Sequence, residues 1–173
     1  MNDIRIPFGL CEITYGDKQL KFMADKASFR AIPKYEKVNG GFLNEITQYY
    51  LVDYEVSLSV VLESEDYETL MMHYPSLVGD GIGLYDNPSN VNTDGQLLTI
   101  HQRGETSRDY DINILNAYIS PENGFKRVFG KEKDKFEILF IGKPSQHYQL
   151  KNSFFYIGDL AQKVGDLNVS WFS

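Results

Sequence analysis

The side chains with the widest chemical repertoire in this sequence are three histidines and a single cysteine. His73, His101 and His147 are far apart in the chain, and no two of them share the spacing of a metal site. Cys11 shares the apolar face of a predicted strand with Ile13 and Tyr15, which indicates a small buried side chain rather than a nucleophile. We therefore expect surface or half-buried histidines, and we predict that the chain is not an enzyme and holds no metal or cofactor.

A glycine-rich segment at residues 79–83 has the composition of a phosphate-binding loop. Such a loop follows a strand and opens a helix, so that backbone N–H groups face the phosphate. Here the segment follows a predicted helix and leads into a further turn, which argues against phosphate binding. Asp80, Asp86 and Asp94 match no calcium-loop spacing. We predict a loop without a ligand over residues 79–95.

Composition narrows the range of partners. The 173 residues include 17 Lys and Arg against 24 Asp and Glu, a net charge of -7, and 42% are hydrophobic. These values indicate one folded domain over residues 1–173, and an acidic chain is a poor match for nucleic-acid phosphates. Basic residues cluster only at 126–127 and 131–135, where acidic neighbours indicate a solvated turn.

A single cysteine excludes an internal disulfide, and no apolar run approaches the roughly 18 residues of a membrane span.

The dominant pattern is an alternation with a period of two over residues 50–62. The alternating residues, all apolar or aromatic, are Tyr50, Val52, Tyr54, Val56, Leu58, Val60 and Leu62. This pattern predicts a long strand with those side chains on its buried face. Similar, shorter runs predict strands at 11–15, 19–22, 29–35, 98–101, 110–119, 125–129 and 136–141. We therefore expect a mainly β fold, a β-sandwich or barrel.

Two local features modify this pattern. Between residues 110 and 119 the apolar side chains change from even to odd positions, which indicates a bulge or burial on both faces. Near the C-terminus, residues 154–157 and the pair Trp171-Phe172 are aromatic. Because exposing such side chains to water is unfavourable, we expect the C-terminus to dock on another surface.

One flanking helix is predicted after the long strand. Ser64 is a suitable N-cap, and Pro75 ends the helix. The apolar residues at i, i+3, i+4 and i+7 are Tyr67, Leu70, Met71 and Tyr74. This spacing places them on one face, which we expect to pack against the sheet.

The segment before the long strand is polar and carries the pair Gly40-Gly41. Adjacent glycines favour a turn. We interpret the segment as either a hairpin that projects from the body or a mobile loop.

In its order of elements the chain resembles the tail tube proteins of long-tailed bacteriophages and the related inner tubes of contractile injection systems. The segments that carry the resemblance are residues 8–17, 27–33, 40–41, 50–62, 63–74, 110–117 and 135–142. They are similar to that family's opening strand and turn, a strand running into an extended loop, a projecting arm, a long strand, an acidic-start helix and the last two sheet strands. The resemblance covers about residues 8–142, and we interpret residues 143–173 as an added interaction segment.

The resemblance implies a structural virion protein whose hexameric rings stack into the tail tube, a conduit for DNA delivery into the host cell. Its implied partners are other copies of itself and the tape-measure, tail terminator and baseplate proteins, without membrane insertion. DNA passes through the lumen without specific binding, which suits an acidic wall. The implied location is the virion, after synthesis in the host bacterial cytoplasm.

By its position the projecting segment is expected to contact neighbouring subunits. The candidate contact residues are Lys34, Tyr35, Glu36, Lys37, Asn39, Gly40, Gly41, Phe42, Leu43, Asn44, Glu45 and Tyr49. Two alternatives stay open. One is a tube-fold protein of a baseplate or of type VI secretion, and the other is a β-barrel whose aromatic residues line a cavity for a small molecule or peptide.

Overall fold

The computed structural model describes residues 9–20, 22–40, 45–62, 66–89, 93–122, 124–131 and 135–165. Its strands are β1 (Cys11–Tyr15), β2 (Lys18–Leu20), β3 (Phe22–Gly40), β4 (Glu45–Leu62), β5 (Leu77–Gly79), β6 (Leu84–Asp86), β7 (Gln96–Gln102), β8 (Ile112–Ile119), β9 (Phe136–Gly142) and β10 (Phe155–Ile157). Its helices are α1 (Tyr67–His73) and α2 (Leu160–Val164). Within these ranges neither helix has the length and apolar character that a bilayer span requires.

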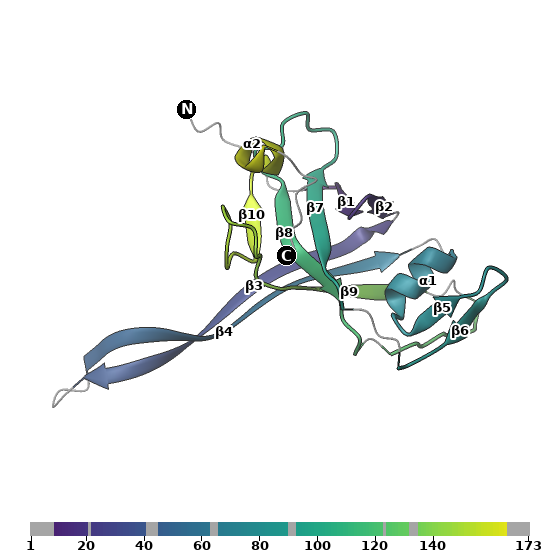
Figure 1. The fold of residues 1–173 in the computed structure, drawn as a ribbon, viewed down its shortest axis with the longest axis horizontal. Helices are drawn as coiled ribbons and strands as arrows, with labels where there is room; N and C mark the ends of the chain where they lie inside the picture. Colours follow the sequence, from purple (N-terminus) through teal and green to yellow (C-terminus); the bar gives the residue numbers. More distant parts are fainter. Residues whose placement is uncertain are drawn as a thin grey trace.

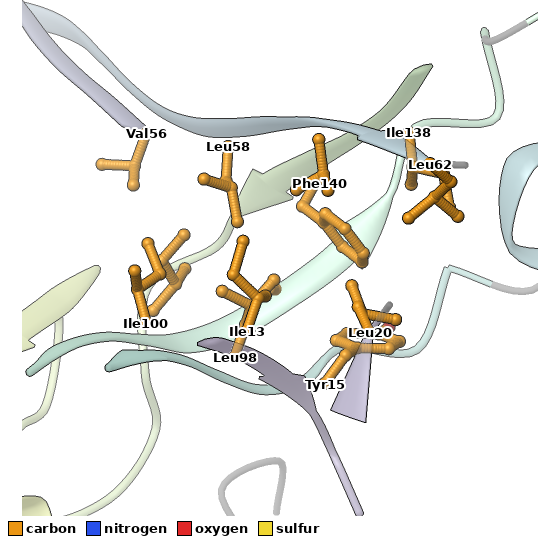
Figure 2. Packing of buried hydrophobic residues seen from close by; sticks show 13 residues of the cluster. Ile13, Tyr15, Leu20, Val56, Leu58, Leu62, Leu98, Ile100, Ile138 and Phe140 are labelled. Carbon is orange, nitrogen blue, oxygen red and sulfur yellow. The ribbon is translucent and has the colours of Figure 1, made fainter. Parts of the chain in front are cut away.

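Most of the strands belong to one antiparallel sheet in the order β2-β1-β7-β8-β9-β4-β3, with β10 paired to β8. The sheet curves back on itself, so that side chains of β4 and β9 meet those of β1 and β7 across the core (Figure 2). β5 and β6 form a separate hairpin beside α1 (Figure 1). The fold is therefore mainly β with a flanking helix, as predicted.

The core fills the space between the two halves of the curved sheet. Its buried hydrophobic residues are Ile13, Tyr15, Leu20, Val56, Leu58, Val60, Leu62, Leu98, Ile100, Ile114, Ala117, Ile138 and Phe140. Tyr15 and Phe140 are in contact, with ring centroids 4.9 Å apart. The alternation over residues 56–62 thus correctly predicts the core face of β4.

β8 is buried on both of its faces. Ile114 joins the main core, whereas Leu115 packs against Leu160 of α2, and neither β8 side chain is exposed. The pairing with β7 also slips by one residue beyond the Leu98–Ile114 pair, which marks a bulge in β8. The change of parity in the sequence reflects both features.

The chain after β9 covers the second face of β8. β10 pairs with β8, and Asp159 caps α2 by accepting a hydrogen bond from Gln162 N at 3.1 Å. Residues 143–165 therefore pack onto the sheet of the same chain. α2 is a second helix, in addition to the one that was predicted. Trp171 and Phe172, for which docking was predicted, lie outside the described residues.

Helix α1 begins after Asp66, while the predicted N-cap, Ser64, lies outside the described residues. The Asp66 carboxylate accepts a hydrogen bond from Thr69 N at 2.7 Å, and the Thr69 hydroxyl accepts one from Asp66 N at 2.9 Å, which completes a capping box. The predicted apolar face is wrong, because Thr69 and His73 are buried whereas Tyr67 is 56% exposed. His73 Nδ1 lies 2.9 Å from a backbone carbonyl oxygen of β9, and this contact holds the polar side of the helix against the sheet.

Two further predictions are corrected. The stretch predicted as a loop over residues 79–95 includes the turn and second strand of the β5–β6 hairpin. In that turn Asp80 Oδ1 accepts hydrogen bonds from two backbone N–H groups at 2.8 and 2.9 Å, which lowers the pKa of its carboxyl. Residues 125–129 form no strand. Instead Phe125 packs on Tyr74, with ring centroids 5.6 Å apart.

Candidate assembly interface

A long β-ribbon extends from one end of the molecule (Figure 1). Beyond the Pro33–Tyr54 pair, β3 and β4 pair only with each other in the part of the chain that the structure describes, because β9 pairs with β4 only from Ser57 onward. We call residues 34–40 and 45–53 the arm and the rest of the described chain the body. The segment is thus the projecting hairpin, one of the two interpretations of its sequence.

The two faces of the arm differ in chemistry. Because cross-strand partners share a face, the pairing assigns each side chain to one of two groups. The face that continues the core side of the sheet carries Tyr35, Lys37, Tyr49 and Leu51. The opposite face carries Lys34, Glu36, Val38, Gln48, Tyr50 and Asp53. We call these the aromatic face and the polar face.

A β-bulge at Val52 produces this arrangement. Lys34 pairs with Asp53, whereas the following residue pairs with Leu51, so that Val52 is left as the extra residue. A bulge of this kind reverses the alternation of faces on one side of it relative to the other and increases the local twist, so the side chains before Val52 lie on the faces opposite to those expected from residues 54–62. The prediction that Tyr50 lies on the core-facing side of the strand is therefore wrong.

Large apolar side chains on the arm are exposed to solvent. Tyr35, Val38, Tyr49, Tyr50, Leu51 and Val52 are each between 46% and 58% exposed. A two-stranded ribbon by itself has little stability in water, and its unpaired edges favour pairing with another chain. Large apolar side chains that are exposed on both faces of a ribbon are typical of a protein-interaction site.

Contacts within the arm hold its side chains in place. Tyr35 and Tyr49 meet edge to face with ring centroids 6.5 Å apart, and Lys37 Nζ lies 5.9 Å from the centroid of the Tyr49 ring. On the polar face the Tyr50 hydroxyl donates a hydrogen bond to Gln48 Oε1. Side chains that are already ordered lose less conformational freedom if another surface covers them.

The predicted contact residues fall into three groups. Lys34, Tyr35, Glu36, Lys37 and Tyr49 are exposed on the arm. Asn39, Gly40 and Glu45 lie in its strands, and Gly41, Phe42, Leu43 and Asn44 lie outside the described residues. The prediction missed Tyr50, Leu51 and Val52 as arm residues, because the alternation assigns them to a half-buried strand and does not mark where the body ends.

Two of the three histidines are more buried than predicted, whereas His101 is half-buried. His73 and His147 are only 7% and 4% exposed. His101 Nδ1 lies 2.6 Å from Oδ1 of the buried Asp111, and its Nε2 lies 3.1 Å from the Glu105 carbonyl oxygen, so this ring links a strand to the loop that follows it. Among the described residues, no three His, Cys, Asp or Glu side chains are grouped as a metal site.

Cys11 is half-buried and packs against the core. Burial raises the pKa of its thiol above the ordinary value, and the nearby Arg103 charge offsets part of that rise. Because the thiolate is the reactive form, a thiol with a raised pKa is a poor nucleophile at neutral pH.

Comparison with solved structures relates this fold to contractile injection systems. No protein-family model and no curated protein matches the sequence. The anti-feeding prophage (AFP) tube terminating cap matches over 90% of this chain and 95% of its own, with a TM-score of 0.55 and 12% identity. A chain of the PVC sheath-tube complex, from an extracellular contractile injection system in its extended state, matches over 82% and 90% with a TM-score of 0.53 and 13% identity.

A third match comes from the sheath/tube terminator of the same PVC system. It covers 83% of this chain and 96% of its own, with a TM-score of 0.51 and 12% identity. At such identities the likeness concerns the fold alone. The chain therefore has a fold that is found in components of these phage-tail-like particles.

Proposed function

We propose that this chain is a structural subunit that assembles with copies of itself into hexameric rings, which stack into the tube of a phage tail. The observation that carries the proposal is the arm, whose aromatic face is exposed in the single chain. In the assembly this face packs on a neighbouring subunit and is removed from water. The lumen is a conduit through which DNA reaches the host cell.

Two further observations support this function. The fold is shared with chains of contractile injection particles, at low sequence identity. The net charge of -7 also suits a conduit, because an acidic wall does not hold nucleic-acid phosphates. We extend the proposal to the tape-measure, tail terminator and baseplate proteins as partners, and to the virion as its location.

A second candidate is a protein that closes the end of a tube. The match to the AFP tube terminating cap, which spans nearly the whole of both chains, favours it. In this role the chain would end a tube, so that no further ring of the same chain stacks on it. The alternative of a ligand-binding barrel has less support, because buried side chains fill the space between the sheet halves.

Electron microscopy of the purified protein at high concentration tests the proposal. We expect rings or tubes of uniform bore, with tubes favouring the tail tube and isolated rings favouring the cap. Tyr49→Ser removes an aromatic side chain from the aromatic face, and Tyr50→Ser is its matched control on the polar face, with similar exposure. We expect the first variant to lose assembly and the second to retain it.

Both variants should give the circular dichroism spectrum of the wild-type chain, because neither side chain contributes to the core. A wild-type chain that stays monomeric at high concentration would contradict self-assembly. Equal loss of assembly in the two variants would contradict the assignment of the contact to the aromatic face.

A further inference from the structure

Residues of the β1–β2 hairpin, α1 and β5 line a groove. These elements lie at the end of the body opposite the arm (Figure 1). The groove consists of two adjoining hollows of ≈ 400 and ≈ 430 Å³, which share Tyr15, Met71, Met72 and the polar Gln96. Leu77 and Ile119 extend the apolar lining of the first hollow. Hollows of this size accept a few side chains, and methionine adapts its shape to whatever packs against it.

The rim of this groove is acidic. Asp17, Glu68 and Asp94 line it and are exposed, whereas Lys18 is the basic residue of the lining. Lys18 already pairs with Glu68 and lies 3.7 Å from Asp66. The groove therefore presents an apolar floor within a net negative border, which favours a segment that carries apolar side chains between basic ones.

The same chain contains such a segment in the loop of residues 125–131. Phe125 anchors the loop by packing on Tyr74 of the helix C-cap. Val128 and Phe129 are 58% and 91% exposed, and Lys131 beyond them is exposed as well. Lys126 and Arg127 precede the apolar pair, so the loop is basic although the chain as a whole has a net charge of -7.

We propose that Val128 and Phe129 of one copy insert into the groove of a second copy, with the flanking basic residues facing the acidic rim. The inference rests on the self-assembly proposed above and adds a contact in which the arm takes no part. The two surfaces are different patches of the chain, so the contact is heterologous and can propagate from copy to copy until a ring closes. Complementary charge and apolar side chains matched to an apolar floor together favour this pairing.

Disulfide trapping between two separately purified variants tests this contact. Phe129→Cys supplies the loop and Met71→Cys the groove, and the mixture is oxidised and analysed on non-reducing gels and by intact mass. Ile82→Cys replaces the loop variant as control, because Ile82 is 90% exposed but lies in the β5–β6 turn. A specific contact raises the effective concentration of the two thiols, so we expect at least about tenfold more heterodimer than in the control mixture. Mixtures with the wild-type chain correct for any reaction at Cys11.

The outcomes separate this contact from the proposed tube. Heterodimer at the control level overturns the contact, even if the wild-type chain forms tubes. Heterodimer without rings or tubes in the microscope supports the contact and contradicts the tube. A double variant, Met71→Cys with Phe129→Cys, that closes within one chain at high dilution overturns the contact in favour of an internal loop closure. A small molecule retained in the groove on native mass spectrometry overturns it in favour of a ligand site.

Discussion

Within the body, β4 presents Leu58 to the core with only 1% of its surface exposed, whereas in the arm the same strand leaves Leu51 54% exposed. Both residues belong to one long strand, and both face the core side of the sheet. The difference lies in what covers them. β1 and β7 supply a second layer over Leu58, and no described part of the chain lies over Leu51 in this way. A period-two pattern therefore specifies a face of a strand, while burial of that face depends on a second layer.

The boundary between the two regions is the bulge at Val52. After that residue the even-numbered side chains of β4 face the core side, whereas before it, in the arm, the odd-numbered side chains Tyr49 and Leu51 do so. A bulge increases twist, and twist carries the ribbon away from the plane of the sheet that it leaves. Because no second layer of the described chain covers the arm, we propose that another subunit covers it.

The largest effect is expected from removing the arm. Replacing residues 35–52 by Asn-Gly joins Lys34 to Asp53, which are already cross-strand partners, through a two-residue hairpin turn. We expect a folded monomer whose free energy of unfolding changes by less than about 1 kcal/mol, because the described side chains of the deleted segment, at 35–38 and 48–52, are exposed. Assembly should be lost completely, as measured by sedimentation velocity and microscopy.

A smaller deletion, of residues 40–45, should act in the same direction. Loss of the folded monomer in either deletion, seen as loss of its circular dichroism signal, would show that the arm supports the body. Tubes formed by the shortened chains would show that the arm is not the contact. The first outcome would contradict the prediction that the body is stable without the arm, and the second would contradict the proposed role of the arm in assembly.

The next effect compares leucines in the same strand. Leu58→Ala should lower the free energy of unfolding by about 2–5 kcal/mol, because it leaves a cavity in a packed core. Leu51→Ala should change it by less than about 0.5 kcal/mol, because the side chain is half exposed. Urea denaturation of the two variants measures the contrast directly. A large loss at Leu51 would indicate that the arm packs on the body in solution.

Much of this architecture can be predicted from the sequence, because strands leave a local signature. The alternation locates β4, the turn after Tyr15 locates the β1–β2 hairpin, and the parity change in β8 indicates its double burial. The arm is also recognisable from its polar composition and glycine pair. These features depend on neighbouring residues in the chain, so they can be read without knowledge of tertiary contacts.

The errors concern features that are decided by distant parts of the chain. The apolar stripe of α1 gave the wrong buried face, because a contact between His73 and β9 orients the helix. Residues 125–129 have the composition of a strand, yet Phe125 is held by Tyr74 and no neighbouring strand pairs with them in the described chain. The groove opposite the arm could not be predicted either, because it joins β1, α1 and β5 from separate parts of the sequence.

A third effect is specific to the body. Burial, with the Asp94 carboxylate nearby, raises the pKa of Tyr15 from 10.0 to about 12. At lower pH both the folded and the unfolded chain keep this proton, so its contribution to stability is complete there. Above about pH 10 the unfolded chain loses the proton first, so stability falls until the pH passes the folded-state pKa of about 12.

Tyr15→Phe removes this ionisation while it keeps the ring. We expect the free energy of unfolding of the wild-type chain to decline more steeply than that of the variant between about pH 9 and about pH 11. Denaturant titrations of both chains at several pH values measure the difference. Parallel curves would indicate that the hydroxyl group is accessible to water in the folded body.

The smallest effect contrasts two aspartates, one in each region. Asp66→Ala removes the N-cap of α1 and should lower the free energy of unfolding by about 1 kcal/mol, whereas Asp66→Asn keeps a capping side chain and should restore most of it. The hydrogen bond from Thr69 N lowers the pKa of the Asp66 carboxyl, so its contribution is present above the unfolded-state pKa and is lost as the pH falls through the folded-state value. Asp53 of the arm bonds only locally in the described contacts, to Tyr54 N at 2.9 Å, and Asp53→Ala should change stability by less than about 0.5 kcal/mol. Equal losses in the two alanine variants would show that polar contacts in the arm stabilise the monomer. That result would contradict the distinction between a body that is stable by itself and an arm that adds little to the stability of the single chain.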